Sequence, residues 1–358
     1  MISITICKTL GDMAKWQSHF AQIRRANLLQ SIEYGLSYGQ FMGQKPRQAF
    51  IEIDGQPAGI CQLMEAGVLN NAIHAVIVDR GPLWLDGYGT KDHHIAFWAE
   101  FDRLYKRRLG RKRRIFPELT VKEGSAADLE NLGFKRLAGP GYQTIWLDLR
   151  PDPDVLRSNL KSKWRGPLSK AERSDLEIQW DSDGTSFPTL LNGYVADKGN
   201  RGYQGPSPKL LQILARYFSV QKNLLIGRAL QGTTTVAAIM ILCHGRSATY
   251  QTGWTTPAGR AVSAHNLLLW NGMQVMRERK IQDFDLGGVS DGAARAVKTF
   301  KEGMGGETVE LIGMFNYRLS LYRKQDDKPW RISVSTLFFG APLCPVMSPH
   351  FCKARVEC

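Results

Sequence analysis

Residues 49–64 read AFIEIDGQPAGICQLM, and residues 224–243 read LLIGRALQGTTTVAAIMILC. Each stretch contains an apolar segment, a short polar turn with Gly55 or Gly232, and a second apolar segment. Two apolar runs joined by a short glycine-containing turn are typical of a β-hairpin. Because the pattern occurs in both halves of the chain, it predicts two copies of one structural unit.

The segments that follow the two hairpins also correspond. After each hairpin the sequence predicts a third strand, a helix and a fourth strand. These are expected at 72–78, 94–109 and 114–117 in the first half, and at 247–254, 263–280 and from Phe284 in the second. Each half therefore has the order strand–strand–strand–helix–strand, an α/β (α+β) pattern in which helices flank a mixed sheet.

Two domains and a tail are predicted. The chain has 358 residues, about twice the length of a typical domain. The first domain is expected over residues 1–150, with a strand at 142–149 as its last element, and Pro151 and Pro153 mark its end. The second is expected over 151–330. Residues 331–358 lose the apolar periodicity and are expected to form a weakly ordered tail.

The composition excludes a largely disordered chain, because 43% of residues are hydrophobic and 22% are charged. The longest apolar run, 236–243, is far shorter than the roughly 18 residues that span a membrane. The N-terminal residues lack the pattern of a secretory signal, so a cytoplasmic location is expected. The net charge, 47 − 33 = +14, favours polyanionic partners such as tRNA, nucleotide phosphates or the anionic inner face of a membrane. A basic but otherwise ordinary enzyme is the alternative.

Two stretches of the second half resemble a known family. Residues 160–165 read LKSKWR, 168–173 read LSKAER, 284–288 read FDLGG and 299–307 read TFKEGMGGE. They resemble the K-W-R…L/I-x-K-A-E-R segment and the D-L-G-G…F-K-x-G-F-G-G ending of the Fem (FemABX) peptidyltransferases. The resemblance spans about residues 25–320 and implies two tandem GNAT-like (acetyltransferase-like) domains.

The resemblance also implies a reaction. Fem proteins transfer an amino acid from aminoacyl-tRNA to an amine of a peptidoglycan precursor peptide, and the new bond is an amide. Aminoacyl-tRNA is then a co-substrate, and no further cofactor is implied. Gly166-Pro167 interrupts the first motif where the family continues as a helix, Met304 replaces the usual Phe, and no long helical hairpin is inserted.

Because of these departures the donor and the acceptor stay open. Wider GNAT-like relatives share the motifs, so acyl transfer from acyl-CoA or an acyl carrier protein is the first alternative. A non-catalytic RNA-binding protein that uses its basic residues is the second. Lys301 and the glycine-rich turn after it argue against the second alternative, since binding alone does not need them.

Lys301 is the predicted catalytic residue. In the resembling motif it follows Phe300, expected to be buried and to line the substrate site, and precedes the turn at Gly303, Gly305 and Gly306. A cation there is placed to meet a developing oxyanion or a substrate phosphate, and the glycines allow close approach of backbone to a ligand. The alternative is a surface lysine at a helix C-terminus before Gly303.

Three further segments are predicted to bind substrate. Five cations lie within residues 161–173, and Lys163 and Arg165 are the members favoured for phosphate. The predicted loop 197–206 combines glycines with Lys198, Arg201 and Tyr203, whose ring is suited to stacking. Gly259 and Arg260 lie in a partial match to the segment with which acetyl-CoA-using GNAT domains hold pyrophosphate. Solvated surface segments are the alternative for each.

The densest basic run lies at 103–114, at the end of a predicted helix. It is predicted to bind tRNA or anionic lipid, with a solubilising turn as the alternative. Its members include Arg107, Arg108, Arg111, Lys112, Arg113 and Arg114.

Metal and covalent chemistry find no support in the sequence. The six cysteines form no CxxC pair, the seven histidines show no ligand spacing, and no GxSxG segment occurs. We therefore expect no catalytic metal and direct attack of the acceptor on the donor, without an acyl-enzyme. Cys61 and Cys243 are expected to be inert thiols in the core.

Overall fold

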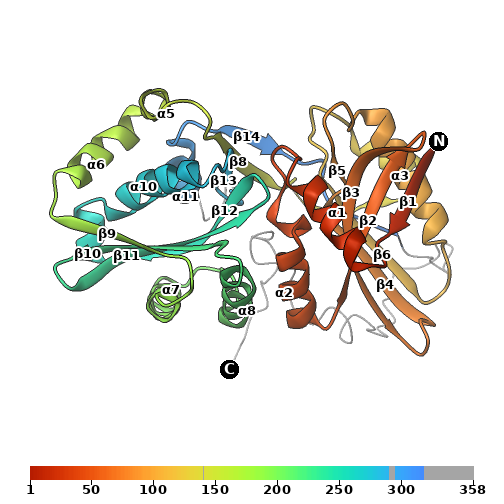
Figure 1. The fold of residues 1–358 in the computed structure, drawn as a ribbon, viewed down its shortest axis with the longest axis horizontal. Coiled ribbons are helices and arrows are strands. Elements are labelled where there is room, and N and C mark those ends of the chain that lie inside the picture. The colour runs from red at the N-terminus through yellow and green to blue at the C-terminus, as the bar shows by residue number, and fades with distance from the viewer. Residues whose placement is uncertain (140, 290–294, 318–358) are drawn as a thin grey trace, which may run out of the picture.

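A computed structural model describes residues 1–139, 141–289 and 295–317. Its strands form two mixed sheets, one in each half of the chain, and helices cover both faces of each sheet (Figure 1). The predicted α/β class is therefore confirmed. The tail predicted at 331–358 lies outside the described residues.

The first predicted hairpin is formed by β2 (Lys45–Ile53) and β3 (Gln56–Val68). Asp54 and Gly55 both have positive φ, 50° and 76°, as a two-residue turn between twisted strands requires. β4 (Ile73–Gly81) pairs with β3, and β6 (Arg111–Pro117) returns parallel to β4 after α3 (Lys91–Leu104). The helix predicted at 94–109 is shorter because residues 105–110 turn the chain back into β6.

The second half repeats this order. β10 (Leu224–Gln231) and β11 (Thr234–His244) form the hairpin, and β12 (Ser247–Thr255) follows antiparallel. The helix α10 (Ala264–Glu278) then leads to β13 (Asp283–Asp285), which lies parallel to β12. Both halves therefore contain the predicted unit, and Cys61 and Cys243 are buried in it as expected.

The other elements extend the sheets and cover them. They are β1 (Ile2–Ile6), α1 (Leu10–Phe20), the 3-10 turn η1 (Leu28–Gln30), α2 (Ile32–Met42), β5 (Leu83–Trp84), α4 (Ala126–Asn131), β7 (Lys135–Arg136), β8 (Gln143–Asp148), α5 (Pro153–Asn159), α6 (Ser162–Glu172), β9 (Leu176–Asp181), α7 (Phe187–Arg201), α8 (Pro208–Ser219), α9 (Pro257–Ala261), α11 (Arg295–Glu302), β14 (Glu307–Glu310) and β15 (Phe315–Tyr317). The strand orders are β1-β2-β3-β4-β6-β15-β7, with β5 beside β3, and β14-β8-β13-β12-β11-β10-β9.

The halves exchange strands. β8 was expected to close the first half, but it lies in the second sheet between β13 and β14. β15, from the end of the described chain, returns to the first sheet between β6 and β7. Phe315 of β15 is completely buried in the core of the first half, so the exchange also completes that core.

A shared core joins the halves on one side. The apolar face of α8 packs against α2, and the two helices stand side by side in Figure 1. Tyr34 and Tyr38 of α2 belong to the same buried cluster as Leu211, Leu214 and Phe218 of α8. α7 covers the same face of the second sheet as α8, while α6 and α10 cover the opposite face.

The helix α6 runs through Gly166-Pro167, although these two residues were expected to interrupt it. Trp164, Leu168 and Ala171 are buried on one side of α6, which packs against α10. This apolar face holds the helix together although Pro167 lacks the N–H that an interior position normally donates.

Candidate active site

A gap opens in the second sheet where two parallel strands separate. β12 and β13 are paired from Ser247↔Asp283 to Thr249↔Asp285. Beyond this point β12 continues to Thr255, while the chain leaves β13 through Gly287 and Gly288. Backbone groups at the end of such a pair lose their sheet partners and face the space between the diverging strands, which is a common location for ligands in α/β folds.

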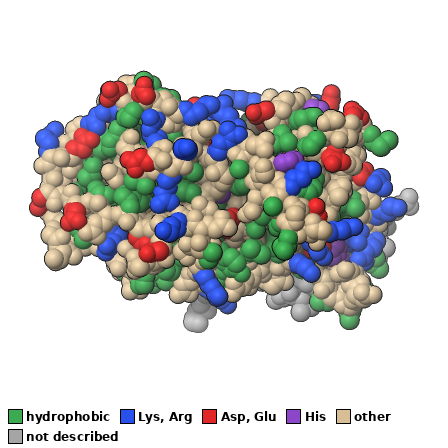
Figure 2. Space-filling model, viewed as in Figure 1, with side chains coloured by type: hydrophobic (Ala, Val, Ile, Leu, Met, Phe, Trp, Pro, Cys, Tyr) green, Lys and Arg blue, Asp and Glu red, His purple; other side chains and the backbone are tan. Residues whose placement is uncertain are grey.

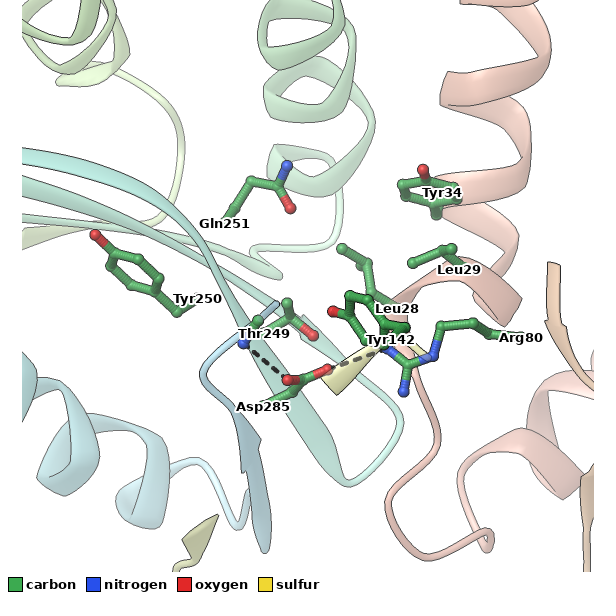
Figure 3. A pocket seen from close by; sticks show the side chains of 10 residues that line it. Leu28, Leu29, Tyr34, Arg80, Tyr142, Thr249, Tyr250, Gln251 and Asp285 are labelled. Carbon is green, nitrogen blue, oxygen red and sulfur yellow. Dashed lines mark hydrogen bonds and ion pairs between the residues drawn. The ribbon is translucent and has the colours of Figure 1, made fainter. Parts of the chain in front are cut away.

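A pocket between the two halves opens at this gap (Figure 3). It holds about 400 Å³ of empty space, part of it open to solvent. The first half and the connection to β8 contribute Leu28, Leu29, Tyr34, Arg80 and Tyr142, and the second half contributes Thr249, Tyr250, Gln251, Asp285 and Gly287. Asp285 is the one carboxylate among these lining residues.

Arg80 and Asp285 meet in the pocket across the boundary between the halves. Arg80 ends β4 with a positive φ of 53° and is only 1% exposed. Its Nε and Nη2 each donate to Glu118 at 2.7 Å, while Nη1 lies 3.4 Å from Oδ2 of Asp285. Because Glu118 takes the two short contacts, Arg80 compensates the charge of Asp285 only in part.

Besides Arg80, two groups fix the carboxylate of Asp285. Thr144 of β8 donates its hydroxyl to Oδ1. The backbone N–H of Gly287 donates to the same oxygen at 2.8 Å. The exchanged strand β8 thus contributes directly to the shape of this pocket. Asp285 lies within the Fem-like motif, although the sequence alone predicts no role for it.

Lys301 lies beside the same gap, buried rather than on the surface. It sits in the last turn of α11 with 9% exposure, and its Nζ donates to the carbonyl oxygens of Gly288 and Gly287 at 3.0 and 3.3 Å. Nζ also lies 5.8 Å from the ring centre of Tyr250. Burial lowers the pKa of Lys301 to about 8, and the nearby charge of Asp285 opposes this shift.

Phe300 and His265 lie next to Lys301. Phe300 is half-buried rather than buried, and its ring packs between those of Trp164 and His265 at 5.9 and 5.8 Å. His265 Nε2 lies 3.3 Å from the hydroxyl of Tyr250. Burial, followed by the charge of Lys301, lowers the pKa of His265 to about 4, so the ring is neutral at pH 7. His265 and Tyr250 were not predicted from the sequence, because no motif marks them.

The glycine-rich turn after Lys301 has a packing role. A Cβ at Gly305, whose φ is +81°, would lie 2.3 Å from the carbonyl oxygen of Asn159. A Cβ at Gly306 would lie 2.6 Å from the carbonyl oxygen of Trp146. The close approach predicted for a ligand is therefore made by the protein's own backbone.

The segment 197–206 is partly helical rather than a loop. α7 continues to Arg201, and Gly202 ends it with a φ of 63°. Lys198 Nζ donates to the carbonyl of Gly205 at 3.1 Å, and Arg201 pairs with Asp197 at 3.7 Å and lies over the ring of Tyr203. Burial raises the pKa of Tyr250, and Tyr203 and Asp197 contribute to the shift. Tyr203 and Asp197 at the end of α7 are thus near Tyr250, while Lys198 and Arg201 make local contacts.

Lys163 and Arg165 lie away from the pocket. Both are exposed on α6, and Arg165 donates to the carbonyl of Ser158 at 3.1 Å. The motif residue between them, Trp164, is buried and contacts Phe300. In this motif the tryptophan connects α6 to the site, while the two cations face solvent.

The segment around Gly259 uses its own N–H groups. Gly259 N donates to Thr256 Oγ1 at 3.1 Å, Arg260 N donates to the carbonyl of Thr256 at 2.9 Å, and Pro257 has no N–H. A Cβ at Gly259 would lie 2.4 Å from the carbonyl oxygen of Val236. The Arg260 side chain donates to the carbonyl of Thr255 at 2.6 Å. Gly259 is therefore required by packing against β11, and the segment offers few free donors to a pyrophosphate.

The basic run at 103–114 is split by β6. Arg113 points inward, is 2% exposed and pairs with Asp102 at 2.5 Å, so its prediction as a surface anion ligand is wrong. The alternation of side chains along a strand sends neighbouring residues to opposite faces, and Lys112 and Arg114 are half-buried on the other face. Arg107, Arg108 and Arg111 each donate to at least one backbone carbonyl.

The fold matches solved structures over nearly the whole chain. The crystal structure of FemX superposes with a TM-score of 0.73 and 15% identity, covering 88% of this chain and 97% of that one. The chain has the FemX fold. A tandem GNAT protein from the clavulanic acid biosynthesis pathway has a TM-score of 0.50 and 13% identity, covering 88% and 98%. A conserved protein of unknown function from Bacteroides thetaiotaomicron has a TM-score of 0.56 and 12% identity, covering 88% and 99%.

Sequence comparison matches part of the chain to one protein family. Residues 157–302 match the acetyltransferase (GNAT) domain family, a range that contains the gap at β12 and β13 and ends just after Lys301. No curated protein matches the sequence. The predicted tandem GNAT-like architecture of the Fem type is confirmed as a fold.

Two general properties bear on this site. Within the described residues, no group of three or more His, Cys, Asp or Glu side chains is placed to hold a metal ion. None of the helices in the described part of the chain is long and apolar enough to cross a bilayer.

Proposed function

We propose that this protein forms an amide bond by transferring an acyl group, in the first place an amino acid, from an activated ester to an amine. The observation that supports this most strongly is the buried ammonium of Lys301 at the gap between β12 and β13, beside the pocket that Asp285 lines. A carboxylate that lines the pocket and a buried cation beside it suit the two changing charges of aminolysis.

In the proposed reaction the acceptor nitrogen attacks the ester carbonyl carbon, and the carbonyl oxygen becomes an oxyanion. The C–O bond to the donor then breaks as the amide forms, and the proton lost by the amine ends on the leaving oxygen. Lys301 stabilises the oxyanion. Asp285 holds the acceptor as an ammonium and takes its first proton, which frees the neutral amine for attack, and the second proton is the one that ends on the leaving oxygen. The rings of Tyr34 and Tyr142 lie nearby in the pocket (Figure 3).

Aminoacyl-tRNA is the proposed donor, and an amine of a peptidoglycan precursor peptide is the proposed acceptor. The net charge of +14 suits a polyanionic donor. The occupied N–H groups of Gly259 and Arg260 weaken the case for coenzyme A, whose pyrophosphate needs free donors. The acceptor is proposed because the motifs around Asp285 and Lys301 resemble those of the Fem family.

The second candidate is N-acyl transfer from acyl-CoA or an acyl carrier protein. It is favoured by the match of residues 157–302 to the acetyltransferase domain family. The tandem GNAT structure from clavulanic acid biosynthesis, which is described as solved without AcCoA, points the same way.

Transfer of radiolabel separates these donors. The full chain is incubated with an amine-bearing stem peptide and with either labelled aminoacyl-tRNA or labelled acyl-CoA, and the labelled amide is quantified. Label transferred from aminoacyl-tRNA by the wild type but not by Lys301→Met supports the proposal. Transfer from acyl-CoA alone assigns the second candidate. Binding of tRNA without transfer from either donor identifies an RNA-binding protein and overturns both.

A further inference from the structure

One end of the first sheet carries large apolar side chains that face solvent. The turn at 69–72 and the segment 105–110 lie side by side there, because Arg108 Nη1 donates to the carbonyl of Ala72 at 2.9 Å and His74 N donates to that of Gly110 at 2.9 Å. The apolar residues of this end, called the apolar tip below, are Val68 (46% exposed), Leu69 (75%), Leu104 (39%) and Leu109 (68%).

The backbone conformation of the turn does not favour a leucine at position 69. Leu69, Asn70 and Asn71 have positive φ values of 52°, 53° and 65°. Asparagine tolerates this conformation, but leucine adopts it only at a cost. Leu69 therefore gains neither burial nor a favourable backbone conformation in the folded chain, which suggests that it contacts something outside it.

Cations surround the apolar tip. They are Lys45, Arg47, Arg103, Lys106, Arg107, Arg108 and Arg111, and the acidic residues among them are Glu65, Glu100 and Asp102. Each of these acids is paired with an arginine, at 3.4, 2.6 and 3.2 Å respectively. Figure 2 shows Lys and Arg side chains gathering over the lower right of the molecule, where the first sheet lies.

We propose that the apolar tip and the cations around it form a docking surface for an anionic lipid membrane. The leucines enter the boundary between headgroups and acyl chains, and the cations remain at the headgroups. This surface is separate from the proposed active site. β4 runs from Ile73 beside the apolar tip to Arg80 at the pocket, seven residue steps or about 23 Å of extended chain.

The same features favour a membrane over RNA. Exposed leucines gain nothing from a phosphate backbone but gain free energy on leaving water. Arg107, Arg108 and Arg111 already donate to carbonyl oxygens, so fewer of their five N–H groups remain for direct phosphate contacts. Their charge remains, and attraction to an anionic surface depends on charge rather than on free donors.

Flotation with lipid vesicles tests the proposal. The full chain is mixed with vesicles of phosphatidylcholine alone or of phosphatidylcholine with phosphatidylglycerol, and the bound fraction is measured at low and high salt. We expect binding to the anionic vesicles only, with the partition coefficient reduced at least about tenfold in the double variant Leu69→Asp, Leu109→Asp. Salt and the variant Lys106→Glu weaken binding as well.

Leu10→Asp is the matched control. Leu10 is 90% exposed at the first position of α1, away from the apolar tip, and an acidic residue there favours the helix dipole. This variant should bind vesicles like the wild type, and thermal melts confirm that all variants fold. Equal binding to neutral vesicles, or full binding by the double leucine variant, overturns the proposal. Loss of tRNA binding in that variant, without loss of vesicle binding, reassigns the surface to RNA.

Discussion

Arg80 at the end of β4 and Asp285 at the end of β13 lie 3.4 Å apart, although 205 residues separate them in the chain. Arg80 lies near the end of β4, which pairs in parallel with β6. Asp285 lies at the end of β13, which pairs in parallel with β12. The fold therefore places the end of the third strand of the first half opposite the end of the fourth strand of the second half, with the pocket between them.

Removing the charge of Lys301 is expected to reduce turnover far more than stability. Lys301→Met keeps most of the side-chain volume and should lower kcat by about 10²–10³ if the ammonium stabilises an oxyanion. The melting temperature should not fall, since the change also removes a buried charge. Lys298→Met on the same helix is the control, because Lys298 contacts Gln143 rather than the glycine carbonyls. Near-normal kcat in Lys301→Met would mean that this lysine is structural.

The pH profile should reveal the ionisation of Lys301. Its pKa in the folded chain, about 8, lies below the usual 10.5, so the required cation is lost as the pH rises above about 8. The ratio of wild-type to Lys301→Met kcat should then fall about tenfold per pH unit, and the ratio cancels the ionisation of the acceptor. Because the unfolded chain binds more protons between the two pKa values, stability should rise with pH in that window. A ratio that rises above pH 8 would instead identify neutral Lys301 as a base.

Asp285→Asn should raise the KM for the acceptor amine at least about tenfold and leave the KM for the donor unchanged. The amide keeps an oxygen for Gly287 N–H and loses the charge that holds an ammonium. Asp283→Asn is the control in the same strand, since Asp283 faces Arg24 and Arg25 instead of the pocket. The two KM values come from saturation curves with each substrate, and an equal effect of both variants would refute the role of Asp285.

Two glycine substitutions separate packing from ligand binding. Gly259→Ala should destabilise the protein by about 1–3 kcal/mol, because the new Cβ would lie 2.4 Å from the carbonyl oxygen of Val236. Gly199→Ala should stabilise it by up to about 1 kcal/mol, because Gly199 lies inside α7 and its Cβ would meet nothing within 4 Å. Denaturant unfolding measures both. If Gly259→Ala raises the KM for the donor without loss of stability, the segment around Gly259 binds the donor's pyrophosphate after all.

Arg113→Met is expected to act on folding rather than on anion binding. The change removes the contacts of the buried guanidinium with Asp102 and with the carbonyl of Tyr105, a loss of about 2 kcal/mol. Affinity for tRNA, measured on the folded protein by filter binding, should stay within about twofold of the wild type, since a buried cation makes no phosphate contact. A large drop in affinity at unchanged stability would show that Arg113 reaches the ligand.

The repeat was predictable because its signals are local. Alternating apolar residues and the turns at Gly55 and Gly232 define each hairpin within about twenty residues of sequence. Strand exchange has no such signal, since β15 is only three residues long and its partners lie nearly 200 residues earlier. Pairing between such distant segments is decided by the packing of the whole core.

The candidate site likewise combines residues that local sequence signals mark with residues that only the fold brings together. Lys301 was selected through its motif, and its position beside Gly287 and Gly288 agrees with a place in the site. Asp285 was in the quoted sequence, but only the fold brings Arg80 to it. The cations Arg113, Lys198 and Arg201 were selected by charge, and charge alone does not say whether a side chain faces solvent, a carboxylate or the chain's own carbonyls.

The exchange of β8 and β15 has a consequence for how the protein is made. While the ribosome extends the chain, the outer edge of β6 stays unpaired until β15 is made, 315 − 117 = 198 residues later. An open edge of this kind pairs readily with other chains. The first half therefore finishes folding after translation of the second, and a fragment ending at residue 150 would expose that edge permanently while carrying β8 without its sheet.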